Sequence, residues 1–166
     1  MAKSEHVPSL AGRARLSNPV HFLALGFGTG LAPRAPGTVG TLAGILVYVL
    51  LLPLPMWGYL LGTLVAIIAG IWICDRAARD FGVHDHPAIV WDEVAGFLIT
   101  MIAAPVGVLW VVLGFALFRV FDVLKPWPIG WLDRRVGGGL GIMVDDILAG
   151  IYALVLLQLL AWWLGG

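Results

Sequence analysis

Residues 35–74 read APGTVGTLAGILVYVLLLPLPMWGYLLGTLVAIIAGIWIC and contain no aspartate, glutamate, lysine or arginine. A helix that crosses a bilayer needs about 20 consecutive apolar residues, so this stretch has room for two crossings. The run LPLPM at residues 52–56 divides it, and each proline removes a backbone donor that a helix would use. The stretch therefore predicts two antiparallel apolar helices, over residues 41–52 and 57–74, joined by a turn.

Two further charge-free intervals follow the same pattern. The interval from Val94 to Phe118 contains the turn sequence APVG, which predicts a tight hairpin with helical arms over residues 94–104 and 108–120. Residues 147–164 fit one more crossing, which ends in two tryptophans, and indole rings favour the membrane interface. The sequence therefore predicts an all-α, polytopic membrane helical bundle.

The overall composition supports a membrane protein and excludes several soluble classes. The mean hydropathy is +0.96, and only 12% of residues are charged, whereas a soluble domain usually has about a quarter. The net charge is zero, so no basic field indicates nucleic-acid binding. The single cysteine, Cys74, cannot form an internal disulfide and is interpreted as a packing residue.

The chain is predicted to form one membrane-embedded domain, residues 18–166, behind a cytoplasmic tail, residues 1–17. The short apolar segment from His21 to Leu31 is interrupted by three glycines and followed by prolines. A short, broken apolar segment favours a re-entrant or interfacial element over a crossing. A close-packed ordinary helix is the alternative, because glycines also let helices approach one another.

The charges are distributed asymmetrically along this predicted topology. Five crossings place the uncharged turns at 53–56 and 104–107 on the outer side, and almost all acids on the inner side. Basic residues concentrate on cytoplasmic loops, so the charged side is predicted to face the cytoplasm. The inner side carries these basic residues: Arg34, Arg76, Arg79, Arg119, Lys125, Arg134 and Arg135.

Carboxylates lie at the predicted ends of three apolar helices. Asp92 and Glu93 open one helix, Asp122 closes another, and Asp145 with Asp146 opens a third. An acidic pair at one helix start has an ordinary explanation, because it caps amides and complements the helix dipole. Five carboxylates together, one of them at an unfavourable helix end, require a cation. Magnesium binds such oxygens and keeps positions for water or phosphate, so we expect a magnesium site.

Small and basic residues accompany these acids. Gly96 follows Asp92 by four residues and Gly150 follows Asp146 by four, so each pair shares a helix face. Small residues there would let the helices approach closely, although generic packing explains them equally well. Lys125 is spaced to share a face with Asp122, and a lysine beside a metal site suits phosphate binding.

Two other polar segments carry weaker signals. His84 and His86 flank an aspartate at a spacing that suits a loop, which is compatible with zinc ligation, hydrogen bonding or proton transfer. The glycine-rich segment 28–41 leads into a predicted helix, whose amides and hydroxyls can hold an oxyanion. It lacks the Gly-Lys-Ser/Thr of a Walker A motif, and a plain turn is the alternative.

Taken together, these motifs resemble the bacterial phosphatidylglycerophosphatase A family over roughly residues 17–155. The matching runs are SNP (17–19), GFGTGLAP (26–33), PGT (36–38), GVHDH (82–86), IVWDE (89–93), FR (118–119) with Asp122, KPWPI (125–129) and GIMVDD (141–146). The resemblance implies a magnesium-dependent hydrolase that converts phosphatidylglycerophosphate to phosphatidylglycerol and phosphate at the cytoplasmic face of the inner membrane.

On this interpretation the predicted site residues take three roles. The metal ligands are Asp92, Glu93, Asp122, Asp145 and Asp146. Asp92, Asp122 and Asp146 are also assigned to catalysis, with His84 or His86 as the proton donor to the leaving group. The phosphate or glycerol head group would be held by Arg34, Thr29, Thr38, Thr41 and Lys125. Direct attack by water and an aspartyl-phosphate intermediate both fit these residues.

Other functional classes fit less well. The Asp-Gly-x-x-Ala-Arg signature of CDP-alcohol phosphotransferases is absent, and so is the Pro-Ser-Gly-His motif of vanadate-type lipid phosphatases. A broader lipid phosphate phosphatase is the related alternative. A cation-binding membrane transporter is the alternative from a different class, but it would favour carboxylates in the middle of helices rather than at their ends.

Overall fold

The computed structural model describes residue 10 and residues 12–165, and every regular element in this part of the chain is a helix. The all-α prediction is therefore confirmed. Most of the predicted tail, residues 1–9 and 11, lies outside the described residues. The elements are α1 (Pro19–Ala24), the 3-10 helix η1 (Gly26–Leu31), α2 (Pro36–Leu51), α3 (Met56–Phe81), α4 (Trp91–Thr100), α5 (Val108–Leu124), α6 (Ile129–Asp133) and α7 (Gly138–Leu164).

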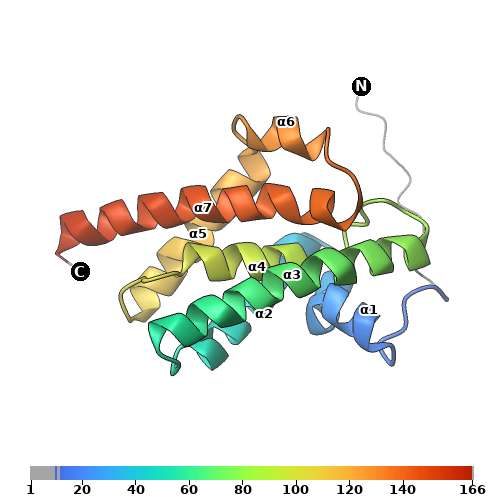
Figure 1. Cartoon of the computed structure of the whole chain (residues 1–166), viewed down its shortest axis with the longest axis horizontal. Helices are drawn as coiled ribbons and strands as arrows, with labels where there is room; N and C mark the ends of the chain where they lie inside the picture. The colour runs from blue at the N-terminus through green and yellow to red at the C-terminus, as the bar shows by residue number, and fades with distance from the viewer. Residues whose placement is uncertain (1–9, 11, 166) are drawn as a thin grey trace.

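The long helices run side by side in alternating directions (Figure 1). The turns that join α2 to α3 and α4 to α5 lie at one end of the molecule, together with the C-terminal end of α7. The segments α1 and η1 and the loop from α3 to α4 lie at the other end. Both predicted hairpins are therefore present, and their turns share one end of the bundle.

Two helices, α3 and α7, are long and apolar enough to cross a membrane. They contain 26 and 27 residues, which at a rise of 1.5 Å per residue gives a length of about 40 Å. Large apolar side chains cover the outer faces of α2, α3, α5 and α7, more than a water-soluble surface usually exposes. The outward-facing set includes Leu46, Leu50, Leu61, Val65, Ile68, Leu109, Val112, Val155 and Leu159.

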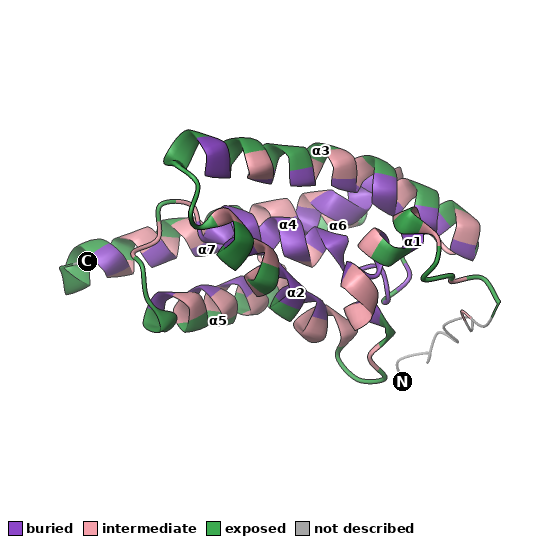
Figure 2. Cartoon of the chain, turned by 90° about the horizontal axis from the view of Figure 1, so that it is seen from below, coloured by how far each residue is buried: buried purple, intermediate pink, exposed green. Residues whose placement is uncertain are grey.

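Helix α4 lies at the centre of the bundle, and nearly all its residues are buried (Figure 2). It contacts α2, α3, α5 and α7. Trp91 donates from its indole nitrogen to the Ala66 carbonyl at 3.0 Å, and Tyr59 donates to the Leu98 carbonyl at 2.7 Å. The arm predicted over 94–104 is shifted toward the N-terminus, because α4 begins at Trp91 and ends at Thr100.

The predicted close approach of small residues on α4 and α7 is present. A Cβ added at Gly150 would lie 2.5 Å from the Gly96 carbonyl oxygen, closer than real side-chain atoms come. The Thr100 hydroxyl donates to the Gly96 carbonyl at 3.0 Å, next to the same contact. The two backbones therefore touch one turn beyond the acidic residues, which brings the acids of both helices together.

We expect Gly150→Ala to destabilise the protein although alanine is the better helix former. The added methyl group overlaps the backbone of α4, and such overpacking costs about 1–3 kcal/mol. Gly62→Ala on α3 is the matched control, because its Cβ meets only the flexible end of Leu51 at 3.0 Å. Thermal unfolding in detergent should show a Tm several degrees lower for Gly150→Ala alone. Equal Tm values for the two variants would contradict the close-contact interpretation.

The segment from His21 to Leu31 forms two short helices rather than one continuous one. Each of α1 and η1 has six residues and so extends only about 9 Å or 12 Å. His21 lies 3.0 Å from the Asp80 carboxylate at the end of α3, and Val90 donates to the Ala24 carbonyl at 2.8 Å. These contacts hold the segment against the polar end of the bundle.

Candidate active site

A cavity of about 400 Å³ opens at the polar end of the bundle and contains all five predicted metal ligands. Its charged lining comes from α4, α5, α7 and the loops beside them. The complete lining is Ala35, Pro36, Gly37, Asp85, Pro87, Ile89, Asp92, Glu93, Arg119, Asp122, Val123, Lys125, Asp145 and Asp146. The five acids, separated by up to 54 positions in the sequence, therefore surround one space.

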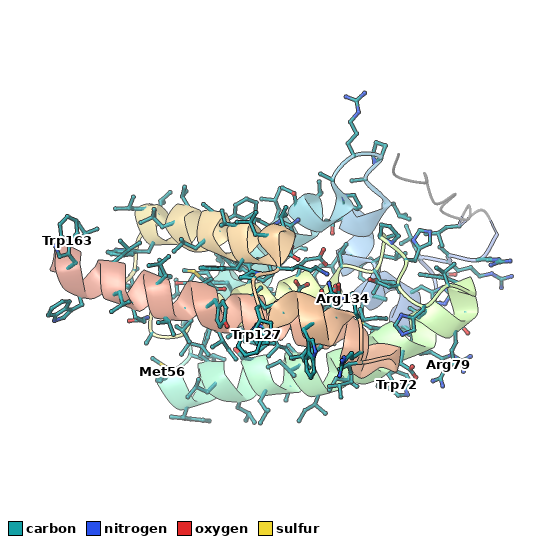
Figure 3. All side chains as sticks on the ribbon, turned by 90° about the horizontal axis from the view of Figure 1, so that it is seen from above. Met56, Trp72, Arg79, Trp127, Arg134 and Trp163 are labelled. Atoms are coloured by element: carbon teal, nitrogen blue, oxygen red, sulfur yellow. The ribbon has the colours of Figure 1, made fainter. Side chains whose placement is uncertain are left out.

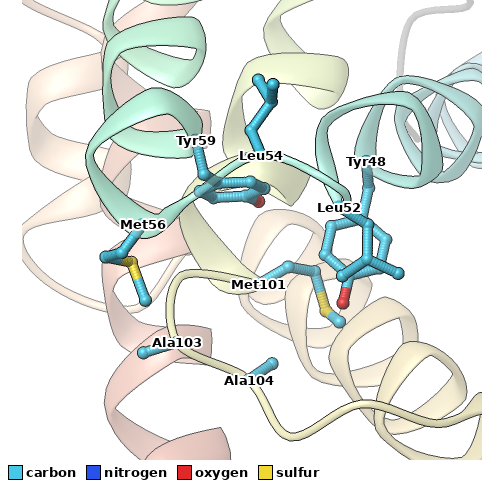
Figure 4. A pocket seen from close by; sticks show the side chains of 8 residues that line it. All are labelled: Tyr48, Leu52, Leu54, Met56, Tyr59, Met101, Ala103 and Ala104. Atoms are coloured by element: carbon cyan, nitrogen blue, oxygen red, sulfur yellow. The ribbon is translucent and has the colours of Figure 1, made fainter.

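A second cavity, at the opposite end, has a different character. It measures about 110 Å³ and lies between the α2–α3 turn and the loop after α4. Tyr48, Tyr59 and Met101 are the largest side chains around it, and its lining contains no acid and no base (Figure 4). Phosphate chemistry requires charge, so the larger cavity is the candidate active site.

The three helices present their acids in different ways. Asp92 and Glu93 occupy the first turn of α4, and Asp122 lies in the last turn of α5, as the sequence predicts. The prediction that Asp145 and Asp146 open a helix is wrong, because α7 begins at Gly138 and the pair lies in its third turn. Glycines permit this early start, since a Cβ at Gly139 would overlap the α3 backbone.

Two groups of acids are close enough to hold a cation. In each group, one carboxylate oxygen from every member lies within 4.8 Å of the others. Asp146 belongs to both groups, which are Asp92, Glu93, Asp146 and Asp122, Asp145, Asp146. Such a shared carboxylate suits a pair of neighbouring divalent ions as well as a single one.

Several of these oxygens are buried without a hydrogen-bond partner among the described residues. They are Asp92 Oδ1, Glu93 Oε2, Asp145 Oδ1 and Asp146 Oδ1. A buried, unsatisfied carboxylate oxygen costs free energy unless a cation or water binds it. The donor set consists of oxygens alone, so the residues present fit a hard divalent ion such as magnesium.

Burial and mutual repulsion raise the pKa values of the acids on α4. The pKa of Asp92 lies well above its usual range. Burial is the main cause, and the charge of the adjacent Glu93 is the second. The pKa of Glu93 is raised to about 8, mainly by burial and next by the charge of Asp146. Without a cation, the protein therefore holds protons on acids that would be ionised in water.

Two basic residues lie among the acids. Arg119 contacts Asp122 at 2.5 Å and lies 3.9 Å from Glu93. Lys125 contacts Asp145 at 2.7 Å and Asp133 at 3.2 Å. Helix α5 ends at Leu124 and Lys125 has a left-handed backbone, so its side chain turns toward α7 and does not continue the helical face.

The structure does not bring His84 and His86 to this cavity. His84 accepts a hydrogen bond from the Gly138 amide at 2.8 Å and lines a separate hollow beside α3. His86 is buried, accepts from the Ala88 amide at 3.1 Å and packs against the Phe81 ring. Both imidazoles thus support the loop from α3 to α4.

The predicted head-group residues are also mostly outside the cavity. Arg34 is exposed on the loop before α2 and does not line it. Thr29 donates to the Gly26 carbonyl at 2.7 Å, and Thr41, fully buried, donates to the Gly37 carbonyl at 2.9 Å. Thr38 is half-buried in the first turn of α2. Of this set, only Lys125 lines the cavity.

Sequence reasoning gave no role to one acid of the lining, and it offered the start of α2 only as an alternative oxyanion site within residues 28–41. Asp85, between the two histidines, faces the cavity, and burial there raises its pKa. The first turn of α2 also borders it, and the first amides of a helix have no acceptor within that helix. A Cβ at Gly37 would overlap Glu93 Oε1, so any larger residue there would displace this carboxylate. Asp85 lies in the sequence run GVHDH and Gly37 in the run PGT, so these two motifs are the sequence features that could have identified both residues.

We expect metal-free protein to lose thermal stability as the pH rises from about 5 to about 8. The raised pKa of Glu93 means that the folded state keeps a proton that the unfolded state releases. That contribution is complete below the ordinary pKa of 4.5 and is lost as the pH rises through about 8. Tm measured in EDTA at several pH values tests this. Glu93→Gln should flatten the profile, and a wild-type profile equally flat would contradict the assignment.

Comparison with known proteins gives a consistent result. The phosphatidylglycerophosphatase A family profile matches residues 22–161. A protein of Escherichia coli K12 named phosphatidylglycerophosphatase A is 47% identical over 96% of this chain and 95% of its own length. A Haemophilus influenzae protein of the same name is 45% identical over 90% and 93%.

A more distant relative has a different name. A Bacteroides thetaiotaomicron protein, provisionally named a phosphatidylinositol-3-phosphatase, is 36% identical over 86% of this chain and 94% of its own length. No solved structure matches the chain.

Proposed function

Because the chain belongs to the phosphatidylglycerophosphatase A family, we propose that it hydrolyses phosphatidylglycerophosphate to phosphatidylglycerol and inorganic phosphate. The observation that carries this proposal is the cavity in which five carboxylates and two basic side chains meet at the polar end of an otherwise apolar bundle. A phosphate monoester attached to a lipid has the matching polarity, with a charged group at head-group depth and chains in the bilayer.

The acids would hold one or two magnesium ions, with Asp146 available to both groups. When bound, the metal neutralises phosphoryl oxygens and makes water a better nucleophile. The unpaired oxygens of Asp92, Glu93 and Asp145 support this assignment, because they have no partner among the described residues. All five residues keep their proposed role as metal ligands.

The basic residues and the start of α2 would bind the phosphate. Arg119 and Lys125 are the cations that line the cavity, and the amides of the first turn of α2 point away from their own helix. Their charges stabilise the extra negative charge that develops on the phosphoryl group. Arg34 and the three threonines are less suited to direct contact, because of their exposure or their hydrogen bonds to the backbone.

The proton balance of the reaction needs a donor for the departing glycerol oxygen. The attacking water would form an O–P bond and release one proton to solvent, the ester P–O bond would break, and the departing alkoxide would take a proton from the donor. Asp85 lines the cavity and its raised pKa favours the protonated form, so we assign it this role in place of His84 or His86.

The same cavity supports a location at the cytoplasmic face of the bacterial inner membrane. The acids and bases gather at one end, whereas the turns at 52–55 and 101–107 contain no charged residue. The topology proposal of five crossings predicts that the C-terminal end of α7 lies outside the cytoplasm. The test uses a reporter enzyme that works only in the cytoplasm, fused after Gly166. Activity of this fused reporter would contradict the proposed topology.

The function is tested by phosphate release from purified protein in detergent. Phosphatidylglycerophosphate should be hydrolysed, with phosphatidate and phosphatidylinositol 3-phosphate as comparison substrates. Preference for phosphatidylglycerophosphate supports the specific function, and equal rates on all three indicate the broader lipid phosphatase. No phosphate release from any lipid, together with metal uptake into protein-containing vesicles, would instead identify a cation transporter.

A further inference from the structure

An apolar groove runs along the bundle surface between α5 and α7. Its volume is about 360 Å³, and its lining consists of Phe121, Ile151, Tyr152, Val155, Leu156 and Leu159. The only polar group on these side chains is the Tyr152 hydroxyl. Val155 and Leu159 are 54% and 56% exposed, so the groove is open to the surroundings of the bundle. It contains nothing that could bind phosphate.

The groove lies next to the acidic cavity, because Phe121 lines the groove and the adjacent Asp122 lines the cavity. Asp145, Tyr152 and Leu159 follow at intervals of seven residues on α7, so they lie along one face of the helix. Phe121 lies in the last turn of α5, and just beyond the end of this helix the Lys125 ammonium contacts Asp145 at 2.7 Å. The Phe121 and Tyr152 rings, 5.6 Å apart, therefore form the end of the groove nearest the charged site.

Helix α6 and the residues before it lie beside this end of the groove. Helix α6 packs against α7, and the Tyr152 hydroxyl donates to the Trp127 carbonyl at 3.3 Å. Trp127 lies beside α7 in Figure 3. Trp127 is 81% exposed, and the Arg135 guanidinium stacks 4.5 Å from the Trp131 ring centre. Exposed tryptophans beside arginines are typical of the lipid head-group region. The groove therefore starts at head-group depth and extends along the apolar part of α7.

We propose that this groove binds one acyl chain of the lipid whose phosphate monoester occupies the acidic cavity. The inference rests on the proposed function and adds the position of the lipid chain. A molecule with a charged head joined to a long apolar chain matches a charged cavity that has an apolar groove beside it. Two other occupants of the groove explain less. A second copy of the protein or an ordinary bilayer lipid would cover the apolar groove, but neither would explain why the groove lies next to the charged cavity.

The proposal predicts that hydrolysis depends on the groove only when the substrate has a long chain. Val155→Trp fills the groove, so we expect the ratio of KM for dipalmitoyl to KM for dihexanoyl phosphatidylglycerophosphate to rise about tenfold. This change corresponds to the lost burial of about two methylene groups. Val65→Trp on α3 is the matched control, because Val65 is equally exposed, at 57%, but lies outside the groove. It should leave the ratio unchanged.

Each result bears on the proposal. An unchanged ratio in Val155→Trp, or an equal rise in Val65→Trp, would overturn it. If Val155→Trp is inactive on both lipids, Leu159→Ala decides, since removing this contact should still raise the ratio. A Val155→Trp protein whose oligomeric mass falls in native mass spectrometry would assign the groove to a second copy. Wild-type protein that hydrolyses neither lipid would refute the proposed function itself, a result distinct from an active enzyme with an unchanged ratio.

Discussion

Replacing Asp146 by asparagine is expected to lower kcat for phosphate release by at least about a thousandfold. Asp146 is shared by both acidic groups, is only 3% exposed and has an unpaired oxygen. Asparagine keeps the size of the side chain but removes the negative charge that would hold the proposed metal. A thousandfold loss corresponds to about 4 kcal/mol of transition-state stabilisation, which is within the contribution of a bound metal ion. Asp92→Asn is expected to abolish hydrolysis in the same way.

The fold of Asp146→Asn should survive this loss of activity. Removing one charge from a buried acidic cluster relieves repulsion, so the metal-free variant should unfold at a temperature equal to or above that of metal-free wild type. Asp75→Asn is the control, because Asp75 lies in a different hollow and its Oδ1, which accepts from the Gly139 amide at 3.2 Å, is retained in asparagine. Near-normal turnover by Asp146→Asn would remove Asp146 from the metal site.

The sequence predicts helix ends well where they depend only on residues that are close together along the chain. Proline-containing turns locate the adjoining ends of α2, α3 and α5 to within one residue, because broken hydrogen bonding acts locally along the chain. The opposite ends of these helices extend four to seven residues beyond the predicted ranges. The sequence also predicts that the five acids lie together, because carboxylates beside apolar helices are costly unless a common ligand binds them. In the structure all five line one cavity.

The structure departs from the sequence-based expectation where contacts between distant parts of the chain determine the local conformation. The glycines before Asp145 favour a loop in isolation, yet they form the start of α7 because only glycine fits against the α3 backbone at Gly139. His84 and His86 have the chemistry of a proton donor, but the loop that carries them turns both rings into structural contacts and leaves Asp85 facing the cavity. No local pattern specifies which side of a loop faces a site.

Removing divalent metal is expected to abolish activity and to lower the Tm of the wild-type protein by several degrees. The proposed cation would bind the folded site and have little affinity for the unfolded chain, in which the acids are dispersed. At a metal concentration of about 100 times Kd this linkage contributes about 2.7 kcal/mol. For a chain of this size, each kcal/mol corresponds to about 2–4 °C in Tm. Dialysis against EDTA, followed by titration with Mg²⁺, should restore both activity and Tm.

The identity of the metal follows from the donor atoms and gives the test its sharpest form. Both acidic groups offer carboxylate oxygens and no histidine or cysteine, because the structure holds His84 and His86 away from the cavity. Oxygen donors favour Mg²⁺ and Mn²⁺, whereas Zn²⁺ gains most from nitrogen and sulfur ligands. Mn²⁺ should therefore replace Mg²⁺ in restoring activity, and Zn²⁺ should not. The Asp146→Asn protein should show almost no rise in Tm with either ion. Full activity and an unchanged Tm after verified metal removal would mean that the acids do not bind a catalytic cation, and that Arg119 and Lys125 alone neutralise the phosphate.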